Sequence, residues 1–212
     1  MQGSKLTPPP PLPDGWWVAT WYDSSTEIKK LTASWVVPTA PKANGALIYL
    51  FPSIEPSGSG GAIVQPVLQY GVSPAGGGNY WAMANWYVTS TTRAYTLPVQ
   101  VKAGDSITGT MSRDSSLSGT WGVSYAVGGV TRSQLFSTAY TSWKAVQGGV
   151  LEVYSITACN QLPASNGVTF TGIKVETFSG VVTPNFTNHK WQSSCSANAT
   201  STSTTAKLTW AS

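Results

Sequence analysis

Residues 120–136, TWGVSYAVGGVTRSQLF, decide the fold of this chain. Two runs rich in Val, Thr and aromatic residues, 120–127 and 130–136, are separated by Gly128-Gly129. Such runs favour β-strands. The two glycines supply the positive φ that both central positions of a type I′ turn require. The stretch therefore predicts an antiparallel β-hairpin.

Most of the chain repeats this pattern. From Gly15 onward, short runs rich in Val, Thr, Trp and Tyr are interrupted every 8 to 12 residues by Gly, Pro, Asn or Ser, with no apolar stripe at helical spacing. About a dozen strands imply an all-β fold of two packed antiparallel sheets, a β-sandwich or jelly roll in a single domain. The predicted strands are residues 16–22, 28–37, 47–52, 63–70, 80–89, 94–101, 106–112, 120–127, 130–136, 150–157, 168–178 and 205–210.

The composition excludes several classes of protein. Only 9% of the 212 residues are charged, against roughly 25% in an ordinary soluble domain. The chain is nevertheless 41% hydrophobic and 11% aromatic, which favours a packed core over disorder. The net charge of +4 comes from scattered cations, with Lys29-Lys30 as the only adjacent pair, and no apolar run is long enough to span a bilayer. We expect a monomer that binds neither nucleic acid nor membrane.

The N-terminal residues differ from the rest. Met1-Gln2-Gly3-Ser4 has the composition of an expression scar, and Pro8-Pro9-Pro10-Pro11 is a polyproline stretch that cannot join a sheet. We therefore expect a leader over residues 1–14 and the β-sandwich domain over residues 15–212.

Two cysteines and two sequons point outside the cell. Cys159 and Cys195 lie too far apart for a redox pair and are too few for a zinc site built on cysteine. We expect a structural disulfide, with two free buried thiols as the alternative. Asn185 and Asn198 begin N-glycosylation sequons, and the chain is rich in Ser and Thr. A secreted, extracellular protein is the expected context.

The low histidine content excludes several common types of catalytic site. His189 is the only histidine, so a multi-histidine metal site is impossible, and no Gly-x-Ser-x-Gly elbow accompanies it for a Ser-His-Asp triad. Phosphate-binding glycine loops followed by a helix are also absent. We expect no metal and no cofactor.

Glu152 is the carboxylate in the most unusual setting. It lies inside the apolar run Gly148-Gly149-Val150-Leu151-Glu152-Val153-Tyr154. If the side chain faces a groove, burial should raise its pKa and make it a candidate general acid or base. If it faces solvent, it is an ordinary strand residue.

A second unusual pattern is a pair of amides on one strand. Strand alternation places Gln65, Val67 and Gln69 on one face of residues 63–70. The amide of Gln69 can donate to an oxyanion, and the alternative is a buried Gln satisfied by neighbouring backbone.

Four short segments, in this order, resemble the glutamic peptidases (eqolisins): TASWVVP at 32–38, VLQYG at 67–71, NWY at 85–87 and GDSI at 104–107. The resemblance covers most of the chain from about residue 15. It implies a secreted acid protease with a concanavalin A-like sandwich. It also implies that Gln69 and Glu152 form a catalytic dyad. In that dyad Glu152 would take a proton from the attacking water, and Gln69 would stabilise the oxyanion.

The segments also depart from the family. Phe51-Pro52-Ser53-Ile54-Glu55-Pro56 keeps an acid at Glu55 in changed surroundings, and Asn85 replaces an acid of the substrate groove. The predicted groove residues are Glu55, Gln65, Trp81, Asn85, Trp86 and Tyr87.

Three functions therefore remain open, with a polypeptide or a polysaccharide as the substrate. The first is peptide hydrolysis by the dyad. The second is carbohydrate binding or polysaccharide cleavage. For this function the aromatic rings near the groove strand, Trp81, Trp86, Tyr87 and Tyr95, could stack on sugars, and Glu55 and Glu152 would be the carboxylate pair. The third is a non-catalytic, lectin-like role of the same fold.

Overall fold

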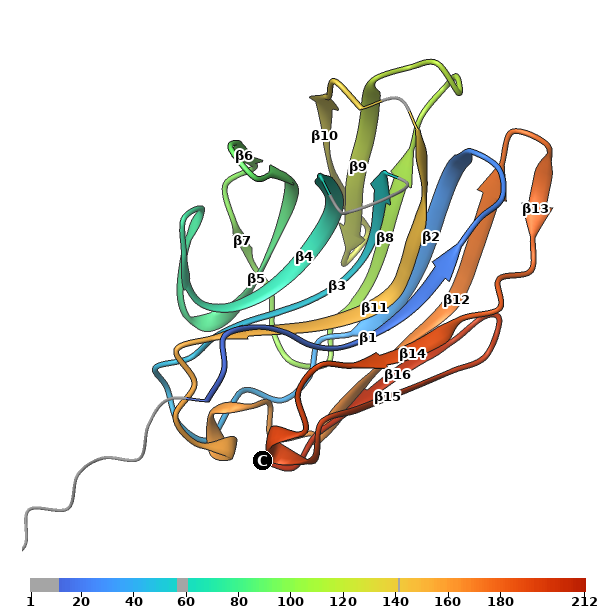
Figure 1. The fold of residues 1–212 in the computed structure, drawn as a ribbon. Helices are drawn as coiled ribbons and strands as arrows, with labels where there is room; N and C mark the ends of the chain where they lie inside the picture. The colour runs from blue at the N-terminus through green and yellow to red at the C-terminus, as the bar shows by residue number, and fades with distance from the viewer. Residues whose placement is uncertain (1–11, 57–60, 141) are drawn as a thin grey trace, which may run out of the picture.

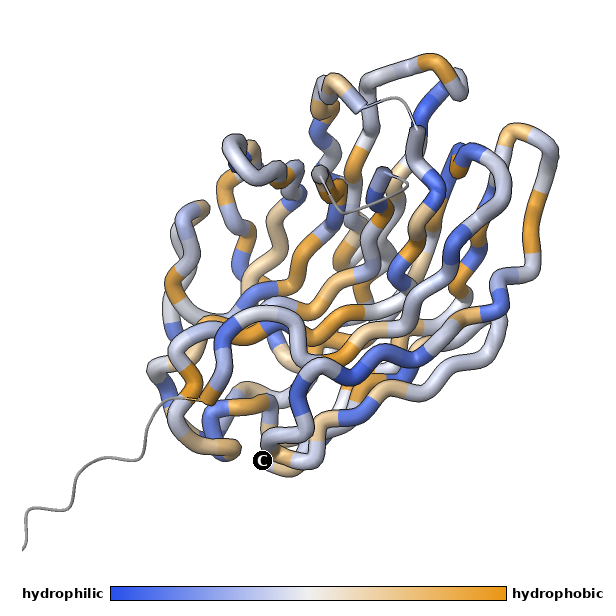
Figure 2. The backbone as a smooth tube through the Cα atoms, in the orientation of Figure 1, coloured by the Kyte–Doolittle hydropathy of each residue, from blue (hydrophilic) through white to orange (hydrophobic). Residues whose placement is uncertain are grey.

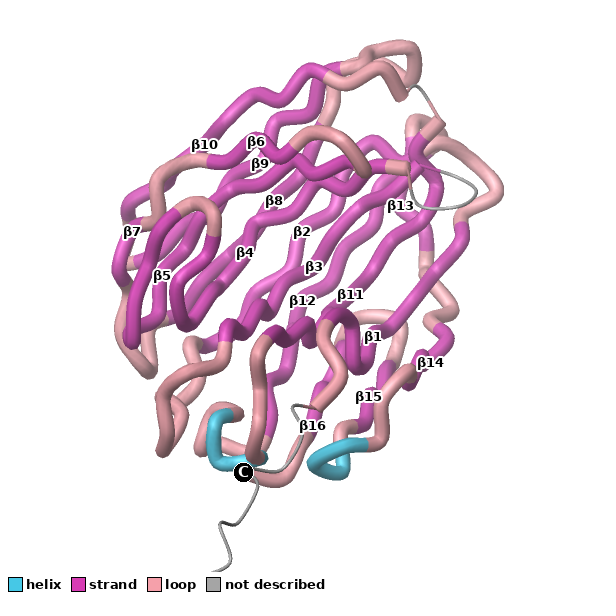
Figure 3. The backbone as a smooth tube through the Cα atoms, turned by 60° about the vertical axis from the view of Figure 1, so that its left-hand side comes forward, coloured by secondary structure: helices cyan, strands magenta, loops and turns pink. Residues whose placement is uncertain are grey.

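The computed structural model describes residues 12–56, 61–140 and 142–212. Within these ranges the chain forms two eight-stranded antiparallel sheets that pack face to face (Figures 1 and 3). The predicted all-β sandwich is confirmed. Residues 1–11, which make up most of the predicted leader, lie outside the described residues.

The first sheet, sheet A, follows the order β14-β1-β11-β3-β4-β5-β6, and β7 also pairs with β5. Its inner strands β3 and β4 are buried along almost their whole length, including polar side chains such as Glu55, Gln65 and Gln69. The strands are β1 (Gly15–Asp23), β3 (Leu47–Pro56), β4 (Ala62–Ser73), β5 (Gly76–Thr89), β6 (Arg93–Tyr95), β7 (Val99–Gln100), β11 (Trp143–Tyr154) and β14 (Thr187–Lys190).

The second sheet, sheet B, follows the order β10-β9-β8-β2-β12-β16-β15, and β13 also pairs with β12. Strands β2, β8 and β9 alternate between buried and less buried residues, as expected where one face packs on the core and the other meets water. The strands are β2 (Ile28–Val36), β8 (Ser106–Ser112), β9 (Thr120–Val127), β10 (Val130–Ser137), β12 (Gly167–Thr177), β13 (Gly180–Val182), β15 (Asn198–Ser201) and β16 (Ala206–Thr209).

The main core lies between the two sheets. Its largest fully buried side chains include Trp17 and Trp143 from sheet A and Trp121 and Phe170 from sheet B. Figure 2 shows hydrophilic residues gathered along the β14–β15 edge and hydrophobic ones in the central strands. A second, smaller apolar cluster draws only on sheet A and includes Phe51, which places it on the face of sheet A that points away from sheet B.

The hairpin at residues 120–136 is present as predicted. Val127 pairs with Val130 across the turn, and both Gly128 and Gly129 have positive φ. By contrast, the predicted strand 94–101 is two short strands, β6 and β7, because Pro98 between them has no N–H to donate. The short strands β13, β14 and β15 were not predicted, and His189 lies in β14.

The pairing of Cys159 with Cys195 is confirmed. The two residues form a disulfide with their Cα atoms 5.4 Å apart. It joins two short 3₁₀ turns, η1 (Cys159–Gln161) and η2 (Ser194–Ser196), at the same end of the sandwich.

Candidate active site

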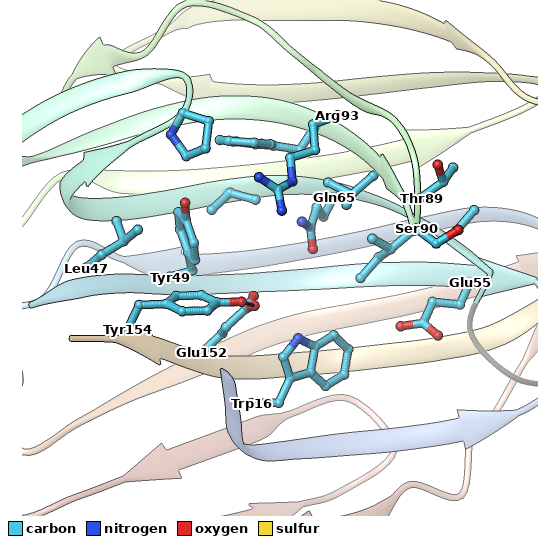
Figure 4. A pocket seen from close by; sticks show the side chains of 16 residues that line it. Trp16, Leu47, Tyr49, Glu55, Gln65, Thr89, Ser90, Arg93, Glu152 and Tyr154 are labelled. Atoms are coloured by element: carbon cyan, nitrogen blue, oxygen red, sulfur yellow. Dashed lines mark hydrogen bonds between the residues drawn. The ribbon is translucent and has the colours of Figure 1, made fainter. Parts of the chain in front are cut away.

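A cavity of about 590 Å³ opens on the outer face of sheet A (Figure 4). Its floor and walls come from six strands of this sheet and from turns that join them. Apolar and aromatic side chains form most of the lining, with two carboxyl groups and one guanidinium among them. The polar and aromatic lining residues are Trp16, Tyr49, Glu55, Gln65, Trp86, Thr89, Ser90, Arg93, Glu152 and Tyr154.

Strand register brings three lining residues into one row with Gln69, which is not a lining residue. Glu152 pairs with Tyr49, and Tyr49 pairs with Gln69, while Trp16 pairs with Glu152 from the other side. Residues directly opposite one another in antiparallel strands point to the same face. Glu152 and Gln69 therefore share a face of sheet A, with Tyr49 between them.

A β-bulge decides that Glu152 faces the cavity. The register of β11 against β3 shifts between Gln147 and Val150, so Gly148 and Gly149 occupy the bulge. A Cβ at Gly149 would lie 2.5 Å from the Phe170 ring of sheet B, so only glycine fits there. The extra residue changes the phase of alternation, which sends Glu152 outward and its neighbour Leu151 into the main core.

The carboxyl group of Glu152 is partly buried and held by two donors. The Tyr154 hydroxyl donates to its Oε1 atom, and the Trp16 side chain, whose indole N–H is a donor, is also hydrogen-bonded to it. Burial raises the pKa of Glu152, and the two hydrogen bonds offset part of that rise. Figure 4 shows both partners beside the carboxylate at one end of the cavity.

Gln69 is fully buried and does not line the cavity. Its Nε2 atom donates to the Gly76 carbonyl at 2.9 Å, and its Oε1 atom accepts from the Ser73 hydroxyl at 3.1 Å. The tip of the β4–β5 hairpin thus packs on the amide, and the Tyr49 hydroxyl is hydrogen-bonded to Ser73. The structure places Gln69 in the same row as Glu152 without bringing the two side chains together.

Glu55 lies at the opposite end of the cavity and is only 6% exposed. Burial raises its pKa to about 7, and the negative charge of Asp23 adds to the rise. Tyr49, which pairs with Glu152, is six residues before Glu55 on β3, a span of about 20 Å along the strand. A glycosidase pair requires carboxyl groups about 5 to 9.5 Å apart. Glu55 and Glu152 are not brought together as such a pair.

The predicted groove residues divide between the two faces of sheet A. Gln65 and Trp86 line the cavity together with Glu55, whereas Trp81 and Tyr87 belong to the main core. Asn85 is buried on the core side, where its Nδ2 atom donates to the Arg132 carbonyl at 3.3 Å. Alternate residues of a strand point to opposite faces, so Asn85 and Tyr87 point inward because Trp86 between them points outward.

The lining residues that were not identified from the sequence include Trp16, Tyr49, Arg93 and Tyr154. Alternation along β11 carries a signal for Tyr154, since it lies two residues after Glu152 and shares its face. The other three reach the cavity from β1, β3 and β6, and only the register of the folded sheet shows that.

No group of three or more His, Cys, Asp or Glu side chains forms a metal-binding cluster in the described part of the chain. None of the helical turns in that part is long and apolar enough to cross a membrane.

Comparison with solved structures identifies the fold. Scytalidoglutamic peptidase with a peptide-based transition-state analogue is similar at a TM-score of 0.66 and 16% identity, covering 93% of this chain and 98% of that chain. SCP-B, a member of the eqolisin family of peptidases in complex with the tripeptide Ala-Ile-His, is similar at 0.61 and 17% identity with the same coverage. Aspergilloglutamic peptidase from Aspergillus niger is similar at 0.54 and 17% identity, covering 77% and 98%.

No family model and no curated protein matches the sequence. At such low identity the structural likeness shows the fold alone. The chain therefore folds as a divergent eqolisin-like β-sandwich.

Proposed function

We propose that this protein is a secreted, monomeric, peptidase-like hydrolase of acidic media, in which Glu152 transfers the proton and Gln69 is its partner. One observation carries the proposal. A carboxyl group with a raised pKa, oriented by Tyr154 and Trp16, lies in a cavity on a fold that resembles the glutamic peptidases. The disulfide is consistent with an oxidising, extracellular setting.

The proposed reaction uses side chains only. Ionised Glu152 removes a proton from water as the water oxygen attacks the peptide carbonyl carbon, which forms a tetrahedral oxyanion. The protonated carboxyl group then gives that proton to the leaving nitrogen as the C–N bond breaks, which restores the carboxylate. A carboxyl group with a raised pKa suits both halves of this transfer in weakly acidic solution.

Gln69 is proposed as the oxyanion donor. An amide nitrogen carries two protons, and the Gly76 carbonyl accepts only one of them. The substrate carbonyl would reach the second N–H once the Tyr49 ring, which lies between Gln69 and Glu152, turns aside.

Carbohydrate binding is the second candidate, and the aromatic lining favours it. Trp16, Tyr49, Trp86 and Tyr154 present rings to the cavity, and such rings can stack on the apolar faces of sugars. The separation of Glu55 from Glu152 disfavours hydrolysis of a sugar chain by two cooperating carboxyl groups.

The wild type, Glu152→Gln and Gln69→Ala should be incubated with denatured protein across pH 2 to 7, while the same samples are screened against polysaccharides. We expect proteolysis by the wild type and a loss of roughly a hundredfold or more in each variant. Asp114→Asn, a matched carboxyl-to-amide change in an exposed turn, should leave the rate unchanged. Polysaccharide retention without proteolysis at any pH would overturn the proposal and support the second candidate.

A further inference from the structure

Two side chains on one wall of the cavity have buried hydrogen-bonding atoms without a partner. The Oε1 atom of Gln65 and the indole nitrogen of Trp86 have no hydrogen-bond partner among the described residues. Gln65 is 7% exposed and Trp86 is 4% exposed, and both line the cavity. Most buried polar groups in folded proteins are paired, so each of these two atoms requires an explanation.

The two side chains are neighbours, and their unpaired atoms are complementary. Gln65 on β4 pairs directly with Trp86 on β5, so their side chains leave the sheet side by side on the same face. One offers an acceptor and the other a donor. Figure 4 shows the amide of Gln65 projecting into the cavity below the guanidinium of Arg93.

The charges around this wall restrict what fits. Arg93 is exposed at the rim and forms no ion pair with any residue that the structure describes. Its positive charge disfavours a Lys or Arg side chain nearby. A purely apolar side chain would leave both buried atoms unpaired. The best match is a planar, uncharged group that carries one acceptor and one donor.

We propose that Gln65 and Trp86 form a subsite for the side-chain carboxamide of a Gln or Asn residue in a bound polypeptide. The Trp86 N–H donates to the carboxamide oxygen of the ligand, and the Gln65 oxygen accepts from the ligand NH₂ group. Gln65 lies four residues before Gln69 on β4, so the selected side chain is about 13 Å from the Gln69 row, or about four residues along an extended peptide. This inference rests on the proposed function for the identity of the ligand as a polypeptide.

Binding is measured in the Glu152→Gln variant, so that cleavage is not needed for a result. The probes are ten-residue peptides of Ala and Ser that carry a single Gln, Glu, Leu or Lys at successive positions, and the readout is calorimetric titration. At one position, Gln should bind at least roughly tenfold tighter than Leu, because a site built to pair a polar group rejects the analogue that lacks it. Lys should bind worst.

Two substitutions test the pair separately. Adding Gln65→Met keeps the length of the side chain and removes the acceptor, while adding Trp86→Phe keeps a ring and removes the donor. Each should reduce the preference for Gln over Leu to about twofold or less while the thermal unfolding midpoint stays close to that of the parent. A preference retained in both variants, no preference in the parent, or no binding of any peptide would overturn the proposal.

The two proposals can fail independently. Preference for Gln without cleavage by the wild type would leave the subsite standing and remove the hydrolase. Cleavage of denatured protein with no preference for Gln at any peptide position would support the hydrolase and remove the subsite.

Discussion

At the scale of single residues, the ionisation of Glu152 is the property on which the chemistry depends. Burial disfavours its charged form, and the hydrogen bonds from Tyr154 and Trp16 favour it. Its pKa is therefore set by two opposing effects, and each of the two donors can be removed by mutation.

Removing the Tyr154 hydroxyl should shift the pH dependence of cleavage. A general base works in its ionised form, so kcat/KM falls as the pH drops through the pKa of Glu152. Tyr154→Phe removes a donor to the carboxylate, raises that pKa further and moves the acidic limb of the profile to higher pH. The measurement is kcat/KM for one peptide across pH 3 to 8.

Tyr22→Phe is the control for this prediction. Tyr22 packs on Phe186 and does not line the cavity. The acidic limb of the pH profile of Tyr22→Phe should therefore coincide with that of the wild type. An acidic limb in Tyr154→Phe that stays in place or moves to lower pH would show that Glu152 is not the titrating base.

At the scale of elements, the β4–β5 hairpin controls the position of Gln69. Gly77 has a φ of +108°, and a Cβ there would lie 2.5 Å from both the Gln69 Nε2 atom and the Gly71 carbonyl oxygen. This close approach lets the strand fold back on the buried amide. The glycine-rich segment at residues 75–78 is the end of a tight turn and the start of β5.

Gly77→Ala should disturb this packing. A left-handed conformation costs an alanine about 1 to 2 kcal/mol of folding free energy. The overlap with Gln69 adds to that cost and displaces the amide, so both the free energy of unfolding and kcat/KM should fall. Urea unfolding and peptide cleavage are the two measurements.

Gly104→Ala separates the two causes. Gly104 has a φ of +90°, but a Cβ there would meet nothing within 4 Å. This control should show the backbone cost alone, with cleavage unchanged. Equal losses of stability in the two variants would mean that the contact with Gln69 contributes nothing.

Sequence patterns predict strands better than they predict which way a side chain faces. The pair Gly128-Gly129 is a turn as expected, whereas Gly148-Gly149 is a bulge within β11, so that strand begins at Trp143 and not at Val150. The difference arises because Phe170 of the opposite sheet packs against Gly149. No local pattern contains that information, and the orientation of Glu152 depends on it.

The orientation of some site residues could nevertheless be predicted from the sequence. Simple alternation along residues 80–89 places Asn85 and Tyr87 on one face and Trp86 on the other, which matches the structure. The burial of Gln69 could not be predicted in the same way, because it depends on how the hairpin folds back on it.

At the scale of the whole molecule, acidic groups with opposite pKa shifts set the pH dependence of stability. Burial tends to raise the pKa of Glu27, but hydrogen bonds from the Trp143 backbone N–H, Arg113 and Ser142 outweigh it and lower the pKa. The stabilisation that Glu27 provides is therefore lost as the pH falls through its folded pKa. The pKa of Glu55 is shifted in the opposite direction, so the stabilisation that Glu55 provides is lost as the pH rises.

The free energy of unfolding should be greatest in weakly acidic solution. The ordinary pKa of Glu55 is 4.5 and its folded value is about 7. The stabilisation that Glu55 provides is fully present below its ordinary pKa and is lost as the pH rises through its folded pKa. The free energy of unfolding falls by about 3 kcal/mol over this range. Glu55→Gln should remove this part of the decline between pH 5 and 8 in urea unfolding, while the part that comes from the raised pKa of Glu152 remains.

Asp114→Asn is the matched control and should keep the decline of the wild type. Equal pH dependence in the wild type and Glu55→Gln would mean that Glu55 is not the group responsible. A stability maximum above pH 8 would contradict this account, in which burial favours the protonated form of Glu55.

The central claim is that Glu152 performs the proton transfer in peptide hydrolysis. The most direct measurement is the initial rate of cleavage of one defined peptide at about pH 5 by purified wild type and Glu152→Gln, with folding of both verified by thermal unfolding. We predict cleavage by the wild type and a rate at least roughly a hundredfold lower in the variant. Equal rates in the two proteins, or no cleavage by the wild type, would contradict the claim.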